Sequence, residues 1–241
     1  MNLLLLHDDD FDSKDTVRLA DDRARHAREV LRVRAGDQLR VGRLGGRVGS
    51  AEVLCNSKEA VELRVTLDSD PPRRPGIDLL LAMPRPKALK RLLPAIASMG
   101  IDRVVLLNAA RVEKSYFDAQ ALSAATVERL FDLGLEQGRD TIRPQLTVER
   151  RFRPYVEDQL PEATAGATCV VAHPGASDDE APSLDGPRLV LAVGPEGGWI
   201  PFELDLLTEA GFQKMSLGVR PLRTEVAIPA LIGATGRLRG V

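Results

Sequence analysis

Apolar and polar residues alternate in several short stretches of residues 1–70, which is the period of a strand that buries one face. Two such stretches, 38–41 and 47–53, flank Gly45-Gly46, a pair that readily takes the positive φ of a tight hairpin turn. A third stretch, 60–67, has the same period. The pattern predicts a small sheet or barrel.

A helical period replaces the alternation at positions 23–31, where Ala24, Ala27, Val30 and Leu31 share one face. Asp21-Asp22 come directly before this face, and such a carboxylate can cap a helix. The remaining faces carry His26 and four arginines, Arg23, Arg25, Arg28 and Arg32. Residues 1–70 are therefore predicted to be β-rich, with one helix and a basic surface.

Prolines mark the boundary that follows, in the segment Asp70-Pro71-Pro72-Arg73-Arg74-Pro75-Gly76. Proline removes a backbone donor and stiffens the chain, so residues 71–76 are predicted to be a short, semi-rigid linker.

Beyond the linker, apolar runs typical of buried strands alternate with helical periods. An apolar strand is expected at 77–83, a helix at 86–98 that stops at Gly100, and another strand at 102–107. The later segments continue this order: helix 121–138, strand 143–148, short helix 152–160, strand 168–172, acidic surface loop 177–187 and strand 189–193. Alternating strands and helices indicate a mostly parallel sheet with right-handed crossovers.

Overall charge adds little to this picture, because the 241-residue chain has a formal net charge of -2. Arginine is nevertheless dense in the first unit, at positions 18, 23, 25, 28, 32, 34, 40, 43 and 47. Such a set is either a solvated face or a face that contacts RNA phosphates, and the sequence leaves both open.

The two cysteines, Cys55 and Cys169, lack the spacing of a metal or redox site and are expected to be small buried hydrophobes. We therefore expect no metal. The apolar run at Leu3–Leu6 is too short for a signal peptide or a membrane span, so we expect a cytoplasmic protein with no membrane partner.

A glycine-bearing loop, Gly194-Pro195-Glu196-Gly197-Gly198, ends the apolar strand at 189–193. It lacks the Lys-Ser/Thr of a phosphate loop and the Gly-x-Gly-x-x-Gly of a dinucleotide fold. A simple strand-to-helix turn, with Pro201 opening the helix, explains one glycine but not three. We therefore expect a ligand pocket where the strand ends.

A second loop, 216–225, carries Arg220 and Arg223 before Thr224, which is expected to cap the last helix. Arginine is unfavourable at a helix N-terminus, so Arg223 requires a negative partner. That partner is either a substrate or a neighbouring Glu225 or Glu196. Pro229 is expected to cost this helix a hydrogen bond or to bend it.

Both loops together resemble the paired signature of the ribosomal RNA small-subunit methyltransferase E family. Three further elements resemble motifs of that family: the helix motif 26–32, Glu136-Gln137-Gly138-Arg139 and His173-Pro174. Taken alone, Glu136 and Arg139 could be only a helical ion pair, and His173 a structural histidine.

The resemblance implies a SPOUT-type α/β knot (trefoil) methyltransferase domain at 77–241, preceded by a PUA-like RNA-binding barrel at 1–70. It also implies S-adenosyl-L-methionine as cofactor, a uridine of 16S rRNA in the small ribosomal subunit as substrate, methylation at the imide nitrogen N3, and a homodimer.

Carried over by position, the implied cofactor-binding residues are His173, Gly194, Pro195, Glu196, Gly197, Gly198, Leu217, Gly218, Leu222, Arg223 and Thr224. The implied RNA-binding residues are Arg23, Arg25, His26, Arg28, Arg32 and Arg139.

The imide nitrogen of uracil is a poor nucleophile while it is protonated, so the reaction needs a proton acceptor or a cation that stabilises the anion. The candidates are Arg223, Glu196, Arg139 and Glu225, which the sequence does not rank. Two alternatives remain: a ribose 2′-O-methyltransferase of the same superfamily, and a non-catalytic RNA-binding or assembly protein, which Pro229 would favour.

Overall fold

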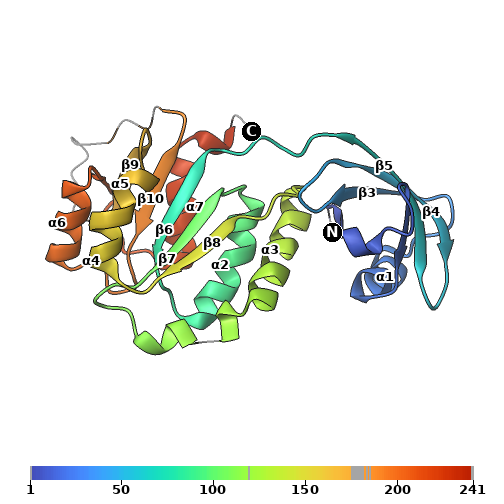
Figure 1. Ribbon diagram of the computed structural model, residues 1–241, viewed down its shortest axis with the longest axis horizontal. Helices are drawn as coiled ribbons and strands as arrows, with labels where there is room; N and C mark the ends of the chain where they lie inside the picture. Colours follow the sequence, from blue (N-terminus) through green and yellow to red (C-terminus); the bar gives the residue numbers. More distant parts are fainter. Residues whose placement is uncertain (1, 119, 175–181, 183, 185, 240–241) are drawn as a thin grey trace. The chain divides into compact units, whose positions relative to one another are not determined.

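The computed structural model describes residues 2–118, 120–174, 182, 184 and 186–239 (Figure 1). It divides the chain into two compact units. The first unit contains Met1–Pro72 and Asp132–Arg143, and the second contains Arg73–Phe131 and Pro144–Val241. Asp132–Arg143 thus groups with the first unit, although the sequence pattern places it among the elements of the second.

A five-stranded sheet forms the first unit, with the order β1-β3-β4-β5-β2. The strands are β1 (Leu4–Leu6), β2 (Thr16–Leu19), β3 (Gln38–Arg43), β4 (Val48–Asn56) and β5 (Val61–Ser69). Only β1 and β3 pair in parallel. The β3–β4 hairpin is confirmed, and Gly45 takes a φ of 72° in its turn. Strands β1 and β2 were not predicted.

The predicted helix at 23–31 is confirmed as α1 (Asp22–His26), which continues as the π-helical turn η2 (Ala27–Leu31). Asp21 caps it by accepting a hydrogen bond from the Arg23 backbone N–H at 2.9 Å. Ala24 and Ala27 face the core, and Arg32 ends the turn at a φ of 54°.

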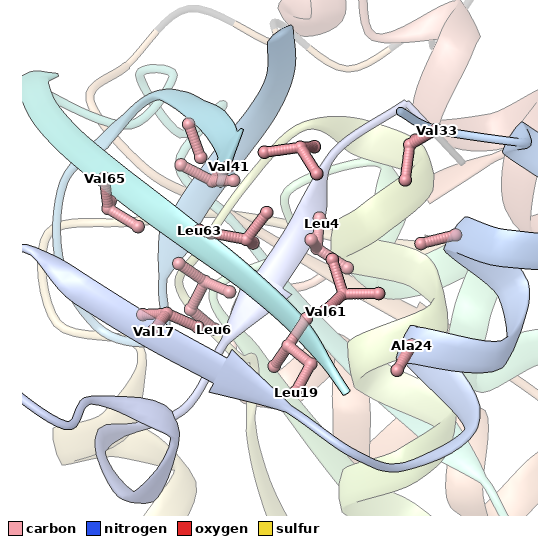
Figure 2. Close-up of a cluster of buried hydrophobic side chains, with 13 residues drawn as sticks. Leu4, Leu6, Val17, Leu19, Ala24, Val33, Val41, Val61, Leu63 and Val65 are labelled. Atoms are coloured by element: carbon pink, nitrogen blue, oxygen red, sulfur yellow. The ribbon is translucent and has the colours of Figure 1, made fainter. Parts of the chain in front are cut away.

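Thirteen buried apolar residues fill the first unit (Figure 2). Leu4, Leu6, Val17 and Leu63 are all less than 4% exposed. Burying each such side chain contributes roughly 1.5–3 kcal/mol. The alternation in β5 therefore points its apolar positions into this core.

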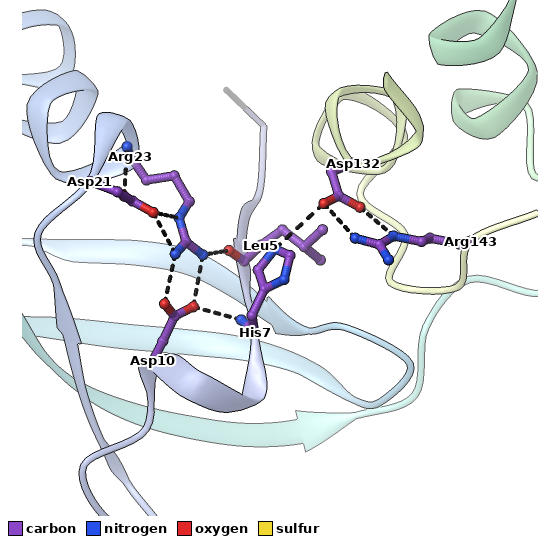
Figure 3. Close-up of polar contacts among 7 residues, drawn as sticks. All are labelled: Leu5, His7, Asp10, Asp21, Arg23, Asp132 and Arg143. Atoms are coloured by element: carbon purple, nitrogen blue, oxygen red, sulfur yellow. Dashed lines mark hydrogen bonds and ion pairs between the residues drawn. The ribbon is translucent and has the colours of Figure 1, made fainter. Parts of the chain in front are cut away.

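Polar contacts attach Asp132–Arg143 to the first unit. Arg143 Nε lies 2.7 Å from an Asp132 oxygen, and His7 Nε2 lies 3.5 Å from the other (Figure 3). The Gly45 backbone N–H also donates to the Thr141 carbonyl at 2.8 Å. The contacts of His7 with Asp132 and of Gly45 with Thr141 join residues that are far apart in the chain, a separation that no local period reports.

Six parallel strands form the sheet of the second unit, in the order β11-β9-β10-β6-β7-β8. They are β6 (Ile77–Ala82), β7 (Arg103–Leu107), β8 (Gln145–Glu149), β9 (Thr168–Ala172), β10 (Leu189–Val193) and β11 (Gln213–Met215). The all-parallel sheet confirms the prediction from the alternating pattern. Strands β7 and β8 extend the sheet on one side of β6, whereas β10, β9 and β11 lie on its other side. The order of the strands therefore reverses between β6 and β10.

Helices cover both faces of this sheet (Figure 1). Helices α2 (Pro86–Ser98) and α7 (Thr224–Ala234) pack against each other, and α4 (Phe152–Pro154) and α5 (Leu160–Ala163) lie on the other face. The remaining helices and turns are α3 (Ala124–Gly138), α6 (Pro201–Glu209), η1 (Asp8–Asp10), η3 (Lys114–Asp118), η4 (Gln120–Leu122), η5 (Tyr155–Gln159) and η7 (Arg237–Arg239). Because both faces are covered, every residue of β6 and β10 is buried.

Two prolines lie inside helices of the second unit. Pro94 lies within α2 and Pro229 within α7, and both helices remain continuous through them. Each proline removes one backbone donor, and packing of the apolar faces offsets that loss. The helix after Thr224 is therefore not interrupted at Pro229.

In the part of the chain that the structure describes, no helix combines the length and the apolar character needed to cross a membrane. Most of the predicted loop 177–187 lies outside the described residues.

Candidate active site

A cavity of about 380 Å³ opens at the carboxyl ends of β9, β10 and β11. These ends meet at one edge because the strands are parallel, and they contribute Ala172, Val193 and Met215 to the wall. Beyond the strands, the wall is completed by the loops 194–199 and 216–222, by α7 and by Arg111. The cavity thus lies where strand order reverses, as expected for ligand sites in open parallel sheets.

Glycine suits the loop 194–199 in two different ways. A side chain on Gly194 would begin 3.2 Å from the Trp199 indole, so the ring packs on bare backbone. Gly198 has a φ of 75°, and its N–H donates to the Pro195 carbonyl at 2.7 Å. The loop therefore exposes main chain to the cavity at a tight turn.

Arg111 lies against the same loop and was not predicted as a site residue. A Cβ on Gly197 would come within 2.9 Å of Arg111 Cδ, and the Arg111 guanidinium donates a hydrogen bond to the Gly197 carbonyl. Its place in the polar loop after β7, at the carboxyl edge of a parallel sheet, is the signal that would have identified it.

The second loop turns at Gly218, which has a φ of 100° and whose N–H donates to Ser216 Oγ at 3.0 Å. This turn places Arg220 and Leu222 on the cavity wall. The segment also leaves apolar groups in solvent, since Val219 is 93% exposed.

Of the predicted cofactor residues, all except Arg223 line the cavity: His173, Gly194, Pro195, Glu196, Gly197, Gly198, Leu217, Gly218, Leu222 and Thr224. Thr224 does so as the first residue of α7 and is 6% exposed. The prediction that its side chain caps the helix is wrong, because the N-cap is Arg223 and no side chain caps this end.

Among the candidate catalytic residues, Glu196 alone lines the cavity. Its Oε1 lies 3.4 Å from the backbone nitrogen of Arg85, at the N-terminus of α2, where the helix dipole favours a carboxylate. Glu225 forms an ion pair at 3.4 Å with Arg91 of α2.

Arg223 is exposed, and no ion pair joins it to Glu225 or Glu196 among the described residues. Arg139 belongs to the first unit, directly after the end of α3, with a φ of 59°. The described residues show no ion pair between Arg139 and Glu136. Burial raises the pKa of Glu136, and the charge of Asp132 raises it further.

His173 is the titratable ring on the cavity wall. Burial lowers its pKa below the usual 6.5, and the charge of Lys214 lowers it further. The imidazole is therefore neutral at pH 7, so it does not repel a cation in the cavity. Glu196 supplies the negative charge on the same wall.

The predicted RNA-binding residues all belong to the first unit. The Arg23 guanidinium donates to Asp10, to Asp21 and to the Leu5 carbonyl (Figure 3). Arg25 pairs with Asp22 at 3.1 Å. His26 Nε2 and one terminal nitrogen of Arg28 are buried without a hydrogen-bond partner, whereas Arg32 is exposed. The Arg23 guanidinium thus donates its hydrogen bonds within the first unit.

No cluster of three or more His, Cys, Asp or Glu side chains suited to a metal ion occurs among the described residues. Cys169 is buried as predicted, but Cys55 is exposed, and the prediction that it is buried is wrong.

The chain is similar to known proteins over most of its length. Residues 72–236 match the family model described as "RNA methyltransferase domain". The ribosomal RNA small subunit methyltransferase E of Mycobacterium tuberculosis is 32% identical over 228 residues, covering 88% of this chain and 83% of the relative. That of Treponema pallidum is 29% identical over 211 residues, covering 86% of this chain and 79% of the relative.

A solved structure shares the fold. The crystal structure of a ribosomal RNA small subunit methyltransferase E from Neisseria gonorrhoeae, bound to S-adenosyl methionine, superposes with a TM-score of 0.75. The likeness covers 99% of this chain and 98% of that chain at 23% identity, so it shows an α/β methyltransferase fold. The chain belongs to the ribosomal RNA small subunit methyltransferase E family of RNA methyltransferases.

Proposed function

We propose that this chain transfers a methyl group from S-adenosyl-L-methionine to N3 of a uridine in 16S rRNA of the small ribosomal subunit. The observation that carries the proposal is the cavity at the carboxyl ends of β9, β10 and β11. Family membership supports the RNA substrate, and the relative crystallised with S-adenosyl methionine supports the cofactor.

The residues on the cavity wall fit such a cofactor. A volume of about 380 Å³ lies within the ~300–1,000 Å³ of sites for small ligands. Bare main chain at Gly197 and Gly198 and the apolar side chains of Leu217 and Leu222 suit a flat adenine ring, while Glu196 and neutral His173 suit a positively charged sulfonium. The cofactor supplies an electrophilic methyl group.

The chain's own residues must then bring the uracil into line and deal with its N3 proton. Glu196 is placed to accept that proton, since its carboxylate lies on the wall. Arg111 and Arg220 also line the cavity, and either guanidinium could stabilise the negative charge that develops on the uracil oxygens. Arg223, Glu225 and Arg139 remain candidates that would act from outside the wall.

The proposal includes a domain organisation. Residues 1–70 would be a PUA-like RNA-binding barrel, 71–76 a linker and 77–241 a SPOUT domain with a C-terminal trefoil knot, in a cytoplasmic protein. The reversal of strand order at β10 is consistent with such a knot. A homodimer would cover the exposed apolar residues of the second loop and α7, which are Leu217, Val219, Leu222 and Val226.

RNA contacts of the first unit form another part of the proposal. Arg25, Arg28, Arg32 and Arg139, with His26, would hold phosphates of the rRNA. We assign Arg23 a structural role instead, because its donors are occupied.

The decisive experiment incubates the protein with the cofactor and 30S subunits that lack the modification, followed by nucleoside mass spectrometry. The expected product is 3-methyluridine. Methyl on ribose would instead support the 2′-O-methyltransferase, and absence of transfer would overturn the proposal. Calorimetry with S-adenosylhomocysteine tests the non-catalytic alternative, which predicts no binding.

A further inference from the structure

A second cavity, of about 320 Å³, lies in the same unit beside the loop that follows β7. Its wall includes Asn108, Lys114, Phe152, Arg153, Phe202 and Glu203. These residues lie in the segments that follow β7 and β8, including η3 and α4, and at the start of α6. The second cavity therefore opens at the same edge of the sheet as the first, and none of its residues was predicted to bind anything.

Aromatic rings make up part of this wall. Phe152 packs on Trp199 with ring centroids 5.9 Å apart and a tilt of 51°, and Trp199 lines the first cavity. The aromatic pair thus contributes one ring to each cavity. Phe202, in the first turn of α6, is 51% exposed, so its ring is accessible to a ligand.

The rim of the second cavity is positively charged. Lys114 is exposed on the wall, and Arg153 is exposed despite an ion pair with Glu157 at 2.8 Å. Glu203, the acidic residue of the wall, has its carboxylate occupied by the N–H groups of Ala110 at 2.6 Å and Ile200 at 3.1 Å. An anion approaching this rim meets cations rather than a free carboxylate.

Asn108 adds an unsatisfied acceptor to the wall. Its Nδ2 donates to the Arg150 carbonyl at 3.1 Å, while its Oδ1 is buried without a partner. Buried acceptors in native proteins are normally satisfied, so an unpaired amide oxygen beside a cavity favours a ligand that brings an N–H donor.

We propose that the second cavity holds a nucleobase of the RNA strand adjacent to the nucleotide being methylated. Splayed bases of single-stranded RNA stack on aromatic side chains, and here Phe152 and Phe202 provide the platform. Lys114 and Arg153 bind the phosphates on either side. Asn108 Oδ1 accepts a hydrogen bond from an N–H of the base.

This inference rests on the proposed function, because it assumes an RNA strand at the first cavity. Phe202→Ala tests it with little risk to folding, since the ring is half exposed. We expect KM for the RNA to rise about ten-fold through the lost stacking, with kcat and the affinity for S-adenosylhomocysteine unchanged. Leu133→Ala, at 48% exposure on α3, is the matched control and should leave KM unchanged.

A direct measurement separates this inference from the proposed function. Adenosine and cytidine monophosphates, whose bases are not the proposed substrate, are added to protein saturated with S-adenosylhomocysteine, and binding is followed by saturation-transfer NMR. Both nucleotides should bind to the wild type but not to Phe202→Ala. Asn108→Leu, which removes the acceptor, should bind both more weakly than the wild type does.

Methyl transfer by the wild type, together with an unchanged KM in Phe202→Ala and no nucleotide binding, would overturn the inference and leave the proposed function intact. Unchanged nucleotide binding by Asn108→Leu would exclude Asn108 as the acceptor. Failure of the wild type to methylate any RNA would instead refute the proposed function.

Discussion

Arg23 in the first unit and Arg220 in the second both belong to basic segments of the sequence, but the fold uses them in opposite ways. The Arg23 side chain is 20% exposed and holds Asp10 and Asp21 at 2.6 and 2.7 Å. Burial alone would lower its pKa, and the hydrogen bonds and charges of the two aspartates outweigh that and raise it. Arg220 is exposed and lines the first cavity. A cation bound internally stabilises the fold, whereas one at a cavity remains available to a ligand.

The largest effect is expected from Arg23→Ala. It would leave Asp10 with a largely buried, unpaired carboxylate, and breaking such a pair costs about 3–5 kcal/mol of unfolding free energy. Urea unfolding measures this loss of unfolding free energy. Arg25→Ala is the control, because its pair with Asp22 is 58% and 87% exposed and should contribute less than about 1 kcal/mol. Equal losses in the two variants would contradict the distinction between internal and available arginines.

Arg220→Ala should have the next largest effect, on catalysis rather than on stability. Loss of a cation that stabilises developing charge lowers kcat by about 10²–10³-fold. Arg223→Ala is the matched variant from the same loop, and we expect a smaller loss because Arg223 does not line the cavity. Single-turnover methylation of 30S subunits gives both values. A greater loss of kcat in Arg223→Ala than in Arg220→Ala would indicate that Arg223 is the catalytic arginine.

Gly198→Ala tests whether the first cavity depends on main-chain shape as well as on charge. At a φ of 75° an alanine is strained by about 1 kcal/mol, and relief of that strain would move the loop. Calorimetry should show an affinity for S-adenosylhomocysteine weakened about five-fold. Gly211→Ala, which has a φ of 91° away from the cavity, carries comparable strain and should leave the affinity unchanged.

The smallest effect concerns pH. The pKa of His173 is lowered below 6.5 in the folded protein, so its neutral form persists at pH 7 and is lost as the pH falls through that lowered value. A cationic His173 would repel the sulfonium by about 1 kcal/mol. Below pH 6.5 the affinity for S-adenosylmethionine should therefore fall, relative to that for uncharged-sulfur S-adenosylhomocysteine, by about five-fold. A parallel decline for both ligands, or the same difference in His173→Gln, would exclude this residue as the cause.

Much of the second unit could be predicted from local pattern. The helix expected at 86–98 has those bounds in α2, because Pro86 favours the first helical position and Gly100 takes a φ of 71° after its end. The strand expected at 189–193 is β10. Both elements are specified by residues close together in the chain, so their periods reveal them.

The first unit was harder to predict. β1 is a run of three leucines with no alternation, and it becomes a strand through parallel pairing with β3. Asp132–Arg143 joins this unit through contacts with His7, Gly45 and Gly46. Hydrogen bonds and ion pairs between distant positions leave no period in the sequence, so they could not be foreseen.

The candidate site shows the same division. The residue pattern predicted a glycine-bearing loop and a ligand pocket at the end of the strand 189–193, and ten of the eleven cofactor residues that the family resemblance implied line one cavity. The sequence did not show that Arg111 joins the wall, that Arg223 does not, or that a second cavity lies beside the first. Backbone conformation follows from neighbouring residues, whereas the direction and the contacts of a side chain depend on elements that packing brings together from distant parts of the chain.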